Sequence, residues 1–359
     1  MKILLLANFS KTSISGYVYQ TLVNIGHDVV FVSPQAENNM IACESRVDVP
    51  KLIQRLNFNP DLLLMVESSV HPLLLPIGLE NVTCITTWWA IDNHINYRWH
   101  KEFAVFFDFV YFAQKDFVKP AIRYSNKNIQ WLPLACEPTI QTQLNLTRDI
   151  ACGFVGNMNK YRQKYFDMLT SNTPIEMVSG LNPTEMSSFY NHCQMVFNLS
   201  MRGDLNMRTF EAMSCGCLLI TQDIQNGLRD LFVPDEHIVV HHLNDAASII
   251  DLYKKMPEKV MEIAQNGYEL VRNKHTYMHR VNQILADVKG GKADRFDSDI
   301  YITRKYFMMN HRQFKVQKTD EIDAAFNNQN LLKKVKYKFR YLKEYIWQKK
   351  YLSKIKKFG

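Results

Sequence analysis

The sequence predicts an α/β protein with two domains, each built on a parallel β-sheet. Short apolar runs alternate with stretches of helical spacing over most of the chain, which is typical of parallel sheets covered on both faces by helices. The alternation stops after Pro133 and Pro138, passes through a polar segment at Gln141 to Asp149, and then begins again. The chain has 359 residues and is 47% hydrophobic, which suffices for two cores of ordinary domain size.

The strands are predicted from the apolar runs. In the first domain they lie at Lys2–Ala7, Asp28–Val32, Asp61–Val66, Thr83–Thr87, Phe109–Phe112 and Ile129–Leu132. In the second domain they lie at Ala151–Val155, Ile175–Val178, Met195–Leu199, Cys217–Thr221 and His237–Val240. We therefore predict two Rossmann-like domains joined near residue 145, over residues 1–145 and 146–290, followed by a segment at 291–359.

The segment from Asn198 to Thr221 predicts a loop, a helix and a buried strand. Phe210 and Met213 have the i, i+3 spacing of a helix, and Gly216 stands where a left-handed residue ends one. Glu211 follows Phe210, so its side chain is turned by about 100° from the apolar face. We expect the carboxylate to point into a cleft.

Polar side chains surround the start of this helix, at Asn206, Arg208 and Glu211. Unpaired backbone N–H groups and the helix dipole favour an anion at such a place. A phosphate-bearing ligand is the expected occupant. The alternative is an ordinary helix–strand junction whose glutamate is solvated.

The cysteines and the apolar runs indicate the cellular compartment in which the protein is expected. The seven cysteines are scattered through predicted strands and turns, which suits buried free thiols in a reducing cytoplasm. Cys215 and Cys217 have no second Cys/His cluster at a suitable spacing, so a structural turn is favoured over zinc. The sequence contains no run of eighteen apolar residues, and its first apolar run is too short for a secretion signal.

The C-terminal extension predicts a basic amphipathic helix. From Leu331 to Gly359 eleven Lys and Arg residues face the single acid Glu344, a formal charge of +10, whereas the whole chain carries +8. An apolar stripe repeats every three or four residues, at Leu332, Val335, Phe339, Leu342 and Ile346. Such a helix is attracted to an anionic membrane surface. The alternatives are packing on the protein's own body or a second subunit, and, less favoured, nucleic-acid binding.

Several motifs occur in order along the second domain: FVGN at Phe154–Asn157 with Arg162 following, FNLS at Phe197–Ser200, RTFEAMSCGCLLIT at Arg208–Thr221, and IAQNG at Ile263–Gly267 leading to His275 and Arg280. Over residues 151 to 287 the chain resembles glycosyltransferases of the CgeB type, within the larger group-1 family that has the two-domain GT-B fold. The first domain resembles the family more weakly, at Gly16, the turn Gly26–Val29 and the segment Trp88–Asp92.

The resemblance implies transfer of a sugar from a nucleotide donor, with UDP as the default, to a glycan, lipid-linked or protein acceptor. It places the donor on the second domain and the acceptor on the first, facing across a cleft. Glu211 matches the family glutamate that binds the ribose hydroxyls. Arg208 and Arg162 are candidates for the pyrophosphate, and Asn157 and Asn206 lie in the same motifs. Two cations and a helix N-terminus could stabilise the leaving diphosphate without a metal or other cofactor.

One position departs from the wider group-1 pattern. That pattern has a further glutamate eight positions before the ribose-binding one, and here the position is Gly203, with Asp204 beside it. We expect Asp204 to meet the donor sugar instead. Retention or inversion at the anomeric carbon is left open by this shift.

Asp92 is the candidate catalytic carboxylate of the first domain, because it follows a strand on the side where ligands bind in parallel α/β sheets. The alternative is that Asp92 caps a helix beginning near Asn96. His94 is a second candidate base, since the pKa of histidine lies near neutrality. His275 is expected to be structural.

Two other functions are compatible with the sequence. A GT-B protein that binds a sugar nucleotide or a partner without turnover fits the missing upstream glutamate, whereas the retained Glu211, Arg208 and Arg162 oppose it. A sugar-nucleotide epimerase is the other, because it also uses two Rossmann-like domains around a cleft. The localisation expected for all three is cytoplasmic, with peripheral membrane contact through residues 331–359.

Overall fold

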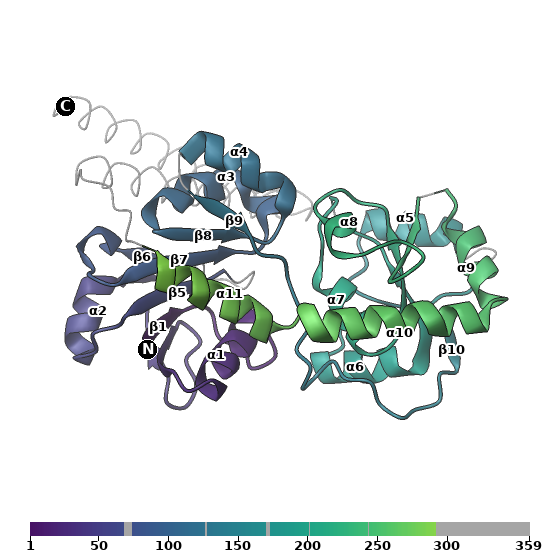
Figure 1. Ribbon diagram of the computed structural model, residues 1–359, viewed down its shortest axis with the longest axis horizontal. Coiled ribbons are helices and arrows are strands. Elements are labelled where there is room, and N and C mark those ends of the chain that lie inside the picture. Colours follow the sequence, from purple (N-terminus) through teal and green to yellow (C-terminus); the bar gives the residue numbers. More distant parts are fainter. Residues whose placement is uncertain (68–73, 126–127, 170–172, 201, 243, 292–359) are drawn as a thin grey trace, which may run out of the picture.

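The computed structural model describes residues 1–67, 74–125, 128–169, 173–200, 202–242 and 244–291. Two α/β domains lie side by side (Figure 1). A cavity lined by residues of both domains lies between them. The predicted fold class is confirmed. The predicted basic helix at 331–359, and with it the membrane contact, lies outside the described residues.

The first domain contains a sheet with the strand order β3-β2-β1-β5-β7-β8-β9, in which every neighbouring pair is parallel. Its strands are β1 (Lys2–Leu6), β2 (Asp28–Ser33), β3 (Ile41–Ala42), β5 (Leu62–Val66), β7 (Ile85–Ala90), β8 (Phe109–Phe112) and β9 (Ile129–Trp131). Its helices are α1 (Ile14–Asn24), α2 (Val49–Leu56), α3 (Asn93–Phe103) and α4 (Val118–Ser125). A separate short pair joins β4 (Arg46–Asp48) to β6 (Leu75–Ile77).

The second domain contains a parallel sheet with the order β11-β10-β12-β13-β14. Its strands are β10 (Ile150–Val155), β11 (Glu176–Val178), β12 (Cys193–Asn198), β13 (Leu218–Gln222) and β14 (Val239–His241). Between residues 150 and 291, the described helices are α5 (Lys160–Leu169), α6 (Pro183–His192), α7 (Met207–Ser214), α8 (Leu228–Leu231), α9 (Ala246–Lys254), α10 (Pro257–Lys274) and α11 (Tyr277–Gly290).

Each of the eleven predicted strands overlaps a strand of the structure, whereas β3, β4 and β6 were not predicted. These three strands have two or three residues each, and β6 contains Pro76. Such segments are too short to show an alternating pattern, and proline disfavours a strand. Their pairing is decided by the neighbouring chain.

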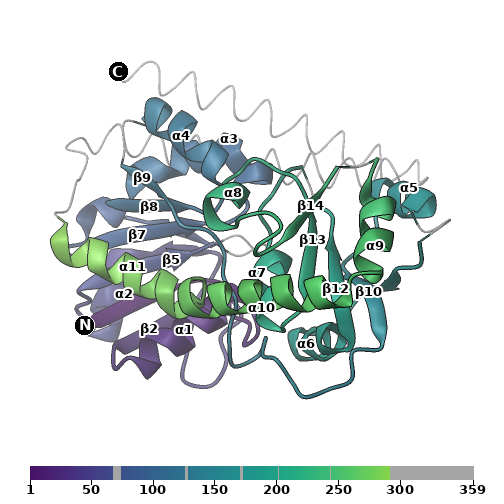
Figure 2. The ribbon, with the colours of Figure 1, turned by 45° about the vertical axis from the view of Figure 1, so that its right-hand side comes forward.

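Helix α11, the last one in the described part of the chain, returns to the first domain (Figures 1 and 2). The chain passes between the domains twice, and the two passages pair at Cys136 and Thr276. Beyond that point α11 packs on α1, with the rings of Tyr17 and Tyr277 5.1 Å apart. The Tyr111 hydroxyl donates to Asp287 at 2.7 Å. The predicted division near residue 145 falls between β9 and β10, so α11 follows the second domain in sequence but packs against the first.

The apolar core continues from one domain into the other. One cluster of buried side chains includes Ile3 and Trp89 of the first sheet together with Phe210 and Met213 of α7. On the opposite face of β7, Trp88 stands at the centre of a second cluster, confined to the first domain. The shared cluster fixes the two domains against each other, and the cavity described below lies next to it.

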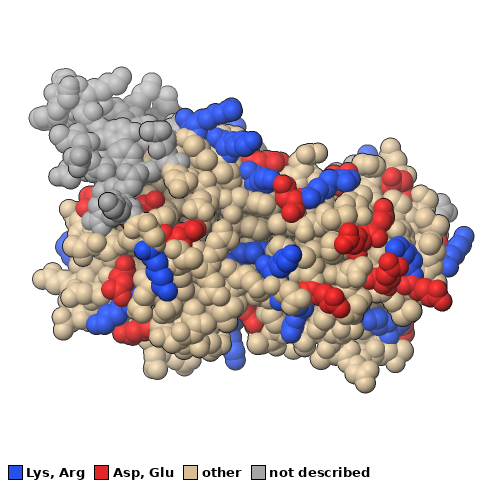
Figure 3. Space-filling model, in the orientation of Figure 1, with Lys and Arg blue, Asp and Glu red and all other residues tan. Residues whose placement is uncertain are grey.

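Charges of both signs are interspersed over the face of the molecule shown in Figure 3. No helix among the described residues is long and apolar enough to cross a membrane. The excess of basic residues counted in the sequence belongs to 331–359, where the structure is not described.

Candidate active site

A cavity of about 480 Å³ lies between the domains, a volume within the range of small-molecule sites. It is placed at the carboxyl ends of the strands, because the lining residues follow strands of both sheets or begin the next helices. Parallel α/β sheets bind ligands at this edge. The polar lining residues used below are Glu67, Asp92, His94, Gln114, Arg162, Asp204, Asn206, Arg208 and Glu211.

Helix α7 presents its polar side to this cavity. Phe210 and Met213 are fully buried in the shared core, as their spacing predicts. Gly216 ends the turn after α7 with a φ of 75°, a left-handed conformation that glycine adopts without a Cβ penalty. Glu211 lines the cavity and is 5% exposed. Burial raises its pKa to about 7, against the opposing charge of Arg208.

Two guanidinium groups stack near one aromatic ring. The Arg208 guanidinium carbon lies 4.6 Å from the centroid of Phe154, and that of Arg162 lies 5.4 Å from it. Gly156 makes this approach possible, because a Cβ there would lie 2.6 Å from Arg208 Nη2 and 3.3 Å from Arg162 Nη1. Burial and the charge of Arg208 lower the pKa of Arg162.

Neutral acceptors hold these two cations. Arg208 Nη1 donates to Asn198 Oδ1 at 2.7 Å, and Arg162 donates to the carbonyls of Asn157 and Leu199 at 2.9 and 3.2 Å. Both Nε atoms are buried and have no hydrogen-bond partner among the described residues. The charge of Asp204 acts on Arg162, and the charges of Arg208 and Glu211 act on each other. The unused Nε–H donors of the two guanidinium groups remain available to an anionic ligand.

The two predicted asparagines have different surroundings. Asn206 is the N-cap residue of α7 and lines the cavity, with Nδ2 donating to Asn198 Oδ1 at 3.1 Å and Oδ1 buried without a partner among the described residues. Asn157 is exposed and is absent from the cavity lining, but its carbonyl holds Arg162. Asn198, which the sequence argument did not single out, organises the group by accepting from both Asn206 and Arg208.

The first domain contributes an acidic wall. Helix α3 begins at Asn93, earlier than predicted, and Asp92 occupies its N-cap position, but the Asp92 side chain makes no capping hydrogen bond. The carboxyl lines the cavity instead. Burial, and then the charge of Glu67, raise the pKa of Asp92 to about 6. Asp92 can therefore accept a proton near neutral pH.

His94 lies on the first domain beside Asp92, and Asp204 faces it from the second domain. Both line the cavity, and the field of Asp204 acts on His94, whose pKa is lowered by burial. His94 Nδ1 is buried without a partner among the described residues. Asp204 Oδ1 accepts from Ser200 Oγ at 2.8 Å. His275, by contrast, packs against the rings of Phe210 and Phe232 and does not line the cavity.

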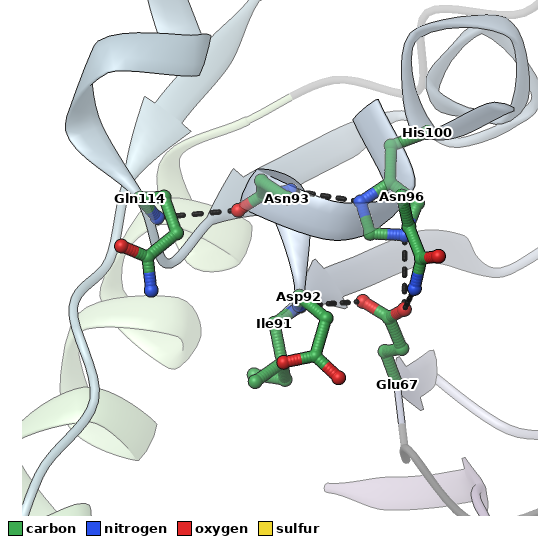
Figure 4. Close-up of polar contacts among 7 residues, drawn as sticks. All are labelled: Glu67, Ile91, Asp92, Asn93, Asn96, His100 and Gln114. Carbon is green, nitrogen blue, oxygen red and sulfur yellow. Dashed lines mark hydrogen bonds and ion pairs between the residues drawn. The ribbon is translucent and has the colours of Figure 1, made fainter. Parts of the chain in front are cut away.

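Glu67 is a further polar residue of the site that was not predicted from the sequence. It follows β5, is 3% exposed, and accepts from the backbone N–H groups of Ile91 and Asp92 at 2.6 and 3.2 Å (Figure 4). Its other oxygen accepts from Asn96 Nδ2 at 3.1 Å and lies 2.9 Å from His100 Nε2. Burial raises the pKa of Glu67, but His100 and the two N–H donors outweigh it and hold the pKa below its usual value.

A signal for Glu67 exists in the sequence. An acid directly after the buried run Leu62–Val66 must lie at the carboxyl end of a strand in a parallel sheet. The partner His100 lies two turns into α3, and only the packing of α3 on β5 and β7 brings it to Glu67.

Comparison with known proteins supports the fold of the whole described chain and the resemblance of the second domain to glycosyltransferases. Residues 139–286 match the family model described as glycosyl transferase-like. A search of curated proteins gives no match.

Solved structures match both domains together. HepE from Anabaena, solved with UDP, has a TM-score of 0.61 and 11% identity over 81% of this chain and 100% of its own. Sucrose-phosphate synthase from Thermosynechococcus elongatus has a TM-score of 0.56 and 11% identity over 80% of this chain and 98% of its own. The protein has the GT-B fold. At such low identities these matches establish the fold, and the family match covers the second domain and most of α11.

Among the described residues, no group of three or more His, Cys, Asp or Glu side chains is placed to hold a metal ion. The Cys215–Cys217 turn is buried, and Arg148 donates to the carbonyl of Cys215 at 2.7 Å. This burial and this hydrogen bond are typical of a structural turn.

Proposed function

We propose that this protein is a glycosyltransferase that moves a hexosyl group from a nucleoside diphosphate sugar to a glycan, lipid-linked or protein acceptor. UDP is the proposed nucleotide. Within the glycosyltransferase-like class, the order of motifs from Phe154 to Arg280 supports a CgeB-type enzyme. HepE from Anabaena, which shares the fold, has been solved with UDP-glucose.

The observation that carries the proposal is the arrangement of charges across one cavity. Arg162 and Arg208 lie on the second domain beside the N-terminus of α7, and Asp92 lies on the first. A diphosphate is a dianion, and planar guanidinium groups with free N–H donors match its oxygens. The opposite wall offers a carboxylate for an acceptor hydroxyl. The two reacting groups would then meet between the domains.

Each residue of the site has a separate role in the proposed transfer reaction. Glu211, as carboxylate, would accept from two ribose hydroxyls. Arg162 and Arg208 would stabilise the charge that grows on the departing diphosphate, so the mechanism we propose needs no divalent metal. Asp92 would accept the proton of the acceptor hydroxyl, with His94 as the second candidate for that role, and Asp204 would contact the donor sugar.

A thermal-shift screen against nucleoside diphosphates and sugar nucleotides tests donor binding. A ligand present at about 100 times its Kd stabilises the native state by about 2.7 kcal/mol. We expect UDP and one UDP-sugar to raise Tm and other nucleotides to do so less. Equal, negligible shifts for all nucleotides would contradict the proposal.

Donor cleavage then separates the three functions. A glycosyltransferase releases UDP much faster when an acceptor is added, an epimerase converts the sugar without any acceptor, and a binding protein releases none. EDTA should leave the rate unchanged. Complete loss with chelator, restored by Mg²⁺ or Mn²⁺, would contradict the metal-free mechanism.

A further inference from the structure

One buried side chain of the first domain pairs with the backbone of the second. Gln114 follows β8 and is 1% exposed. Its Oε1 accepts from Leu205 N at 2.9 Å, and its Nε2 donates to Leu205 O at 3.3 Å. Both polar groups of the Gln114 side chain thus pair with the backbone N–H and C=O of one residue in the opposite domain. Leu205 directly follows Asp204.

A second amide completes the contact from the other side. Asn226 of the second domain is 3% exposed, and its Nδ2 donates to Gln114 Oε1 and, at 3.0 Å, to Gly203 O. Asn226 also exchanges two hydrogen bonds of 3.1 Å with Asp116, through its N and Oδ1. The loop that carries Asp204 is therefore held on both sides by side-chain amides.

The same glutamine is tied to the acidic wall (Figure 4). Gln114 N donates to Asn93 Oδ1 at 3.2 Å, and Asn93 Nδ2 lies 2.9 Å from His100 Nδ1. His100 in turn contacts Glu67, which binds the backbone N–H of Asp92. A continuous series of hydrogen bonds thus runs from the Asp92 loop, through Gln114, to the Asp204 loop.

We infer that Gln114 and Asn226 are positioning residues, which form an amide clasp between the domains and align Asp204 with Asp92 and His94. The inference rests on the proposed function. The clasp contacts neither arginine nor Glu211, so it sets the geometry between the two halves of the site and leaves the nucleotide contacts unchanged. Misplacement of reacting groups by about 1 Å can cost about 10²-fold in rate.

A nearby contact between the same domains provides the control. Lys115 pairs with Asp230 across the interface, with side chains 41% and 48% exposed. An exposed ion pair contributes about 0 to 1 kcal/mol, and neither residue lines the cavity. Lys115→Ala therefore removes a contact between the domains without loosening the Asp204 loop.

The experiment compares Gln114→Ala, Asn226→Gly and Lys115→Ala with the wild-type protein. Glycine tolerates the φ of 48° at position 226, so that variant removes the amide without backbone strain and serves if Gln114→Ala fails to fold. Three quantities are measured: hydrogen exchange at Leu205, whose N–H donates to Gln114; UDP affinity; and UDP-glucose cleavage at saturating donor.

We expect both clasp variants to exchange the Leu205 amide faster, to bind UDP within about twofold of wild type, and to cleave UDP-glucose about 10- to 100-fold more slowly. Lys115→Ala should resemble wild type in all three. Unchanged cleavage in a variant whose Leu205 amide has become exchangeable would overturn the positioning role, as would a parallel loss of UDP affinity. A wild-type protein that binds no UDP would instead refute the proposed function, and the positioning role with it.

Discussion

The two walls of the cavity satisfy their charged groups in opposite ways. On the first domain, the Glu67 carboxylate has four hydrogen-bond partners, all from its own domain. On the second, Arg162 and Arg208 are held by neutral oxygens and one aromatic ring, and their Nε atoms have no partner in the described chain. The Glu67 network is complete within the first domain, whereas the arginines of the second domain have donors left unused.

This difference assigns different tasks to the two walls. A satisfied, buried network fixes one geometry, since breaking any single bond leaves a buried polar group unpaired. Two like charges with unused donors repel each other, and an anionic ligand that accepts from those donors would relieve the repulsion. The first domain is built to position a group, and the second is built to bind a charge.

The largest effect is expected where the unused donors are removed. Arg208→Ala and Arg162→Ala should each lower the rate of donor cleavage by about 10²- to 10³-fold, the cost typical of losing a donor to a developing negative charge. Arg208→Lys should retain part of the rate, because it keeps the charge but not the planar stack on Phe154. Steady-state kinetics measures all three. Full activity in both alanine variants would show that the second wall does not bind the diphosphate.

The next effect concerns nucleotide affinity. Glu211→Ala should weaken UDP binding by about 1.5–3 kcal/mol, the contribution of hydrogen bonds to a charged group. Isothermal titration calorimetry against UDP and against pyrophosphate distinguishes the ribose from the phosphates, since pyrophosphate has no ribose to lose. Equal weakening for both ligands would remove the ribose assignment and leave only a change in local charge.

A smaller effect is expected when the first wall is loosened. Glu67→Gln keeps the shape but presents an NH₂ group to donors that need an acceptor, so we expect a loss of about 1–3 kcal/mol in stability and about tenfold in rate, with UDP affinity unchanged. The charge of Glu67 raises the pKa of Asp92. Without it, the acidic limb of the pH–rate profile should move to lower pH, and a limb that stays in place would argue against Asp92 as the base.

The smallest effect concerns stability and pH. Burial raises the pKa of Glu211 to about 7, so the folded protein holds this proton more tightly than the unfolded chain does. The corresponding stability is present below the ordinary pKa of a glutamate and is lost as the pH rises through about 7. Glu211→Gln has no such loss. The difference in Tm between the variant and the ligand-free wild type should therefore grow in favour of the variant between pH 5 and pH 8, and a constant difference would contradict the raised pKa.

The sequence by itself determined the elements whose pattern is local. Buried parallel strands are continuous apolar runs, so β1, β5 and β8 could be located from composition, and Phe210, Met213 and Gly216 defined α7 by spacing and turn chemistry. The second wall could be predicted for the same reason. Arg208 and Glu211 lie three residues apart on one helix. The family resemblance added Arg162, which was expected in the loop after FVGN but lies in the first turn of α5.

Only the tertiary structure decided the first wall and its connection to the second. Glu67 and His100 are 33 residues apart, and Gln114 and Asn226 are 112 apart, and no local pattern links such positions. A hydrogen bond between them depends on strand order and on how the domains pack, which are properties of the whole chain. The packing of α11 on the first domain depends on the whole chain for the same reason. Its apolar residues can be identified in the sequence, but the surface that they cover belongs to α1, which lies far away along the chain.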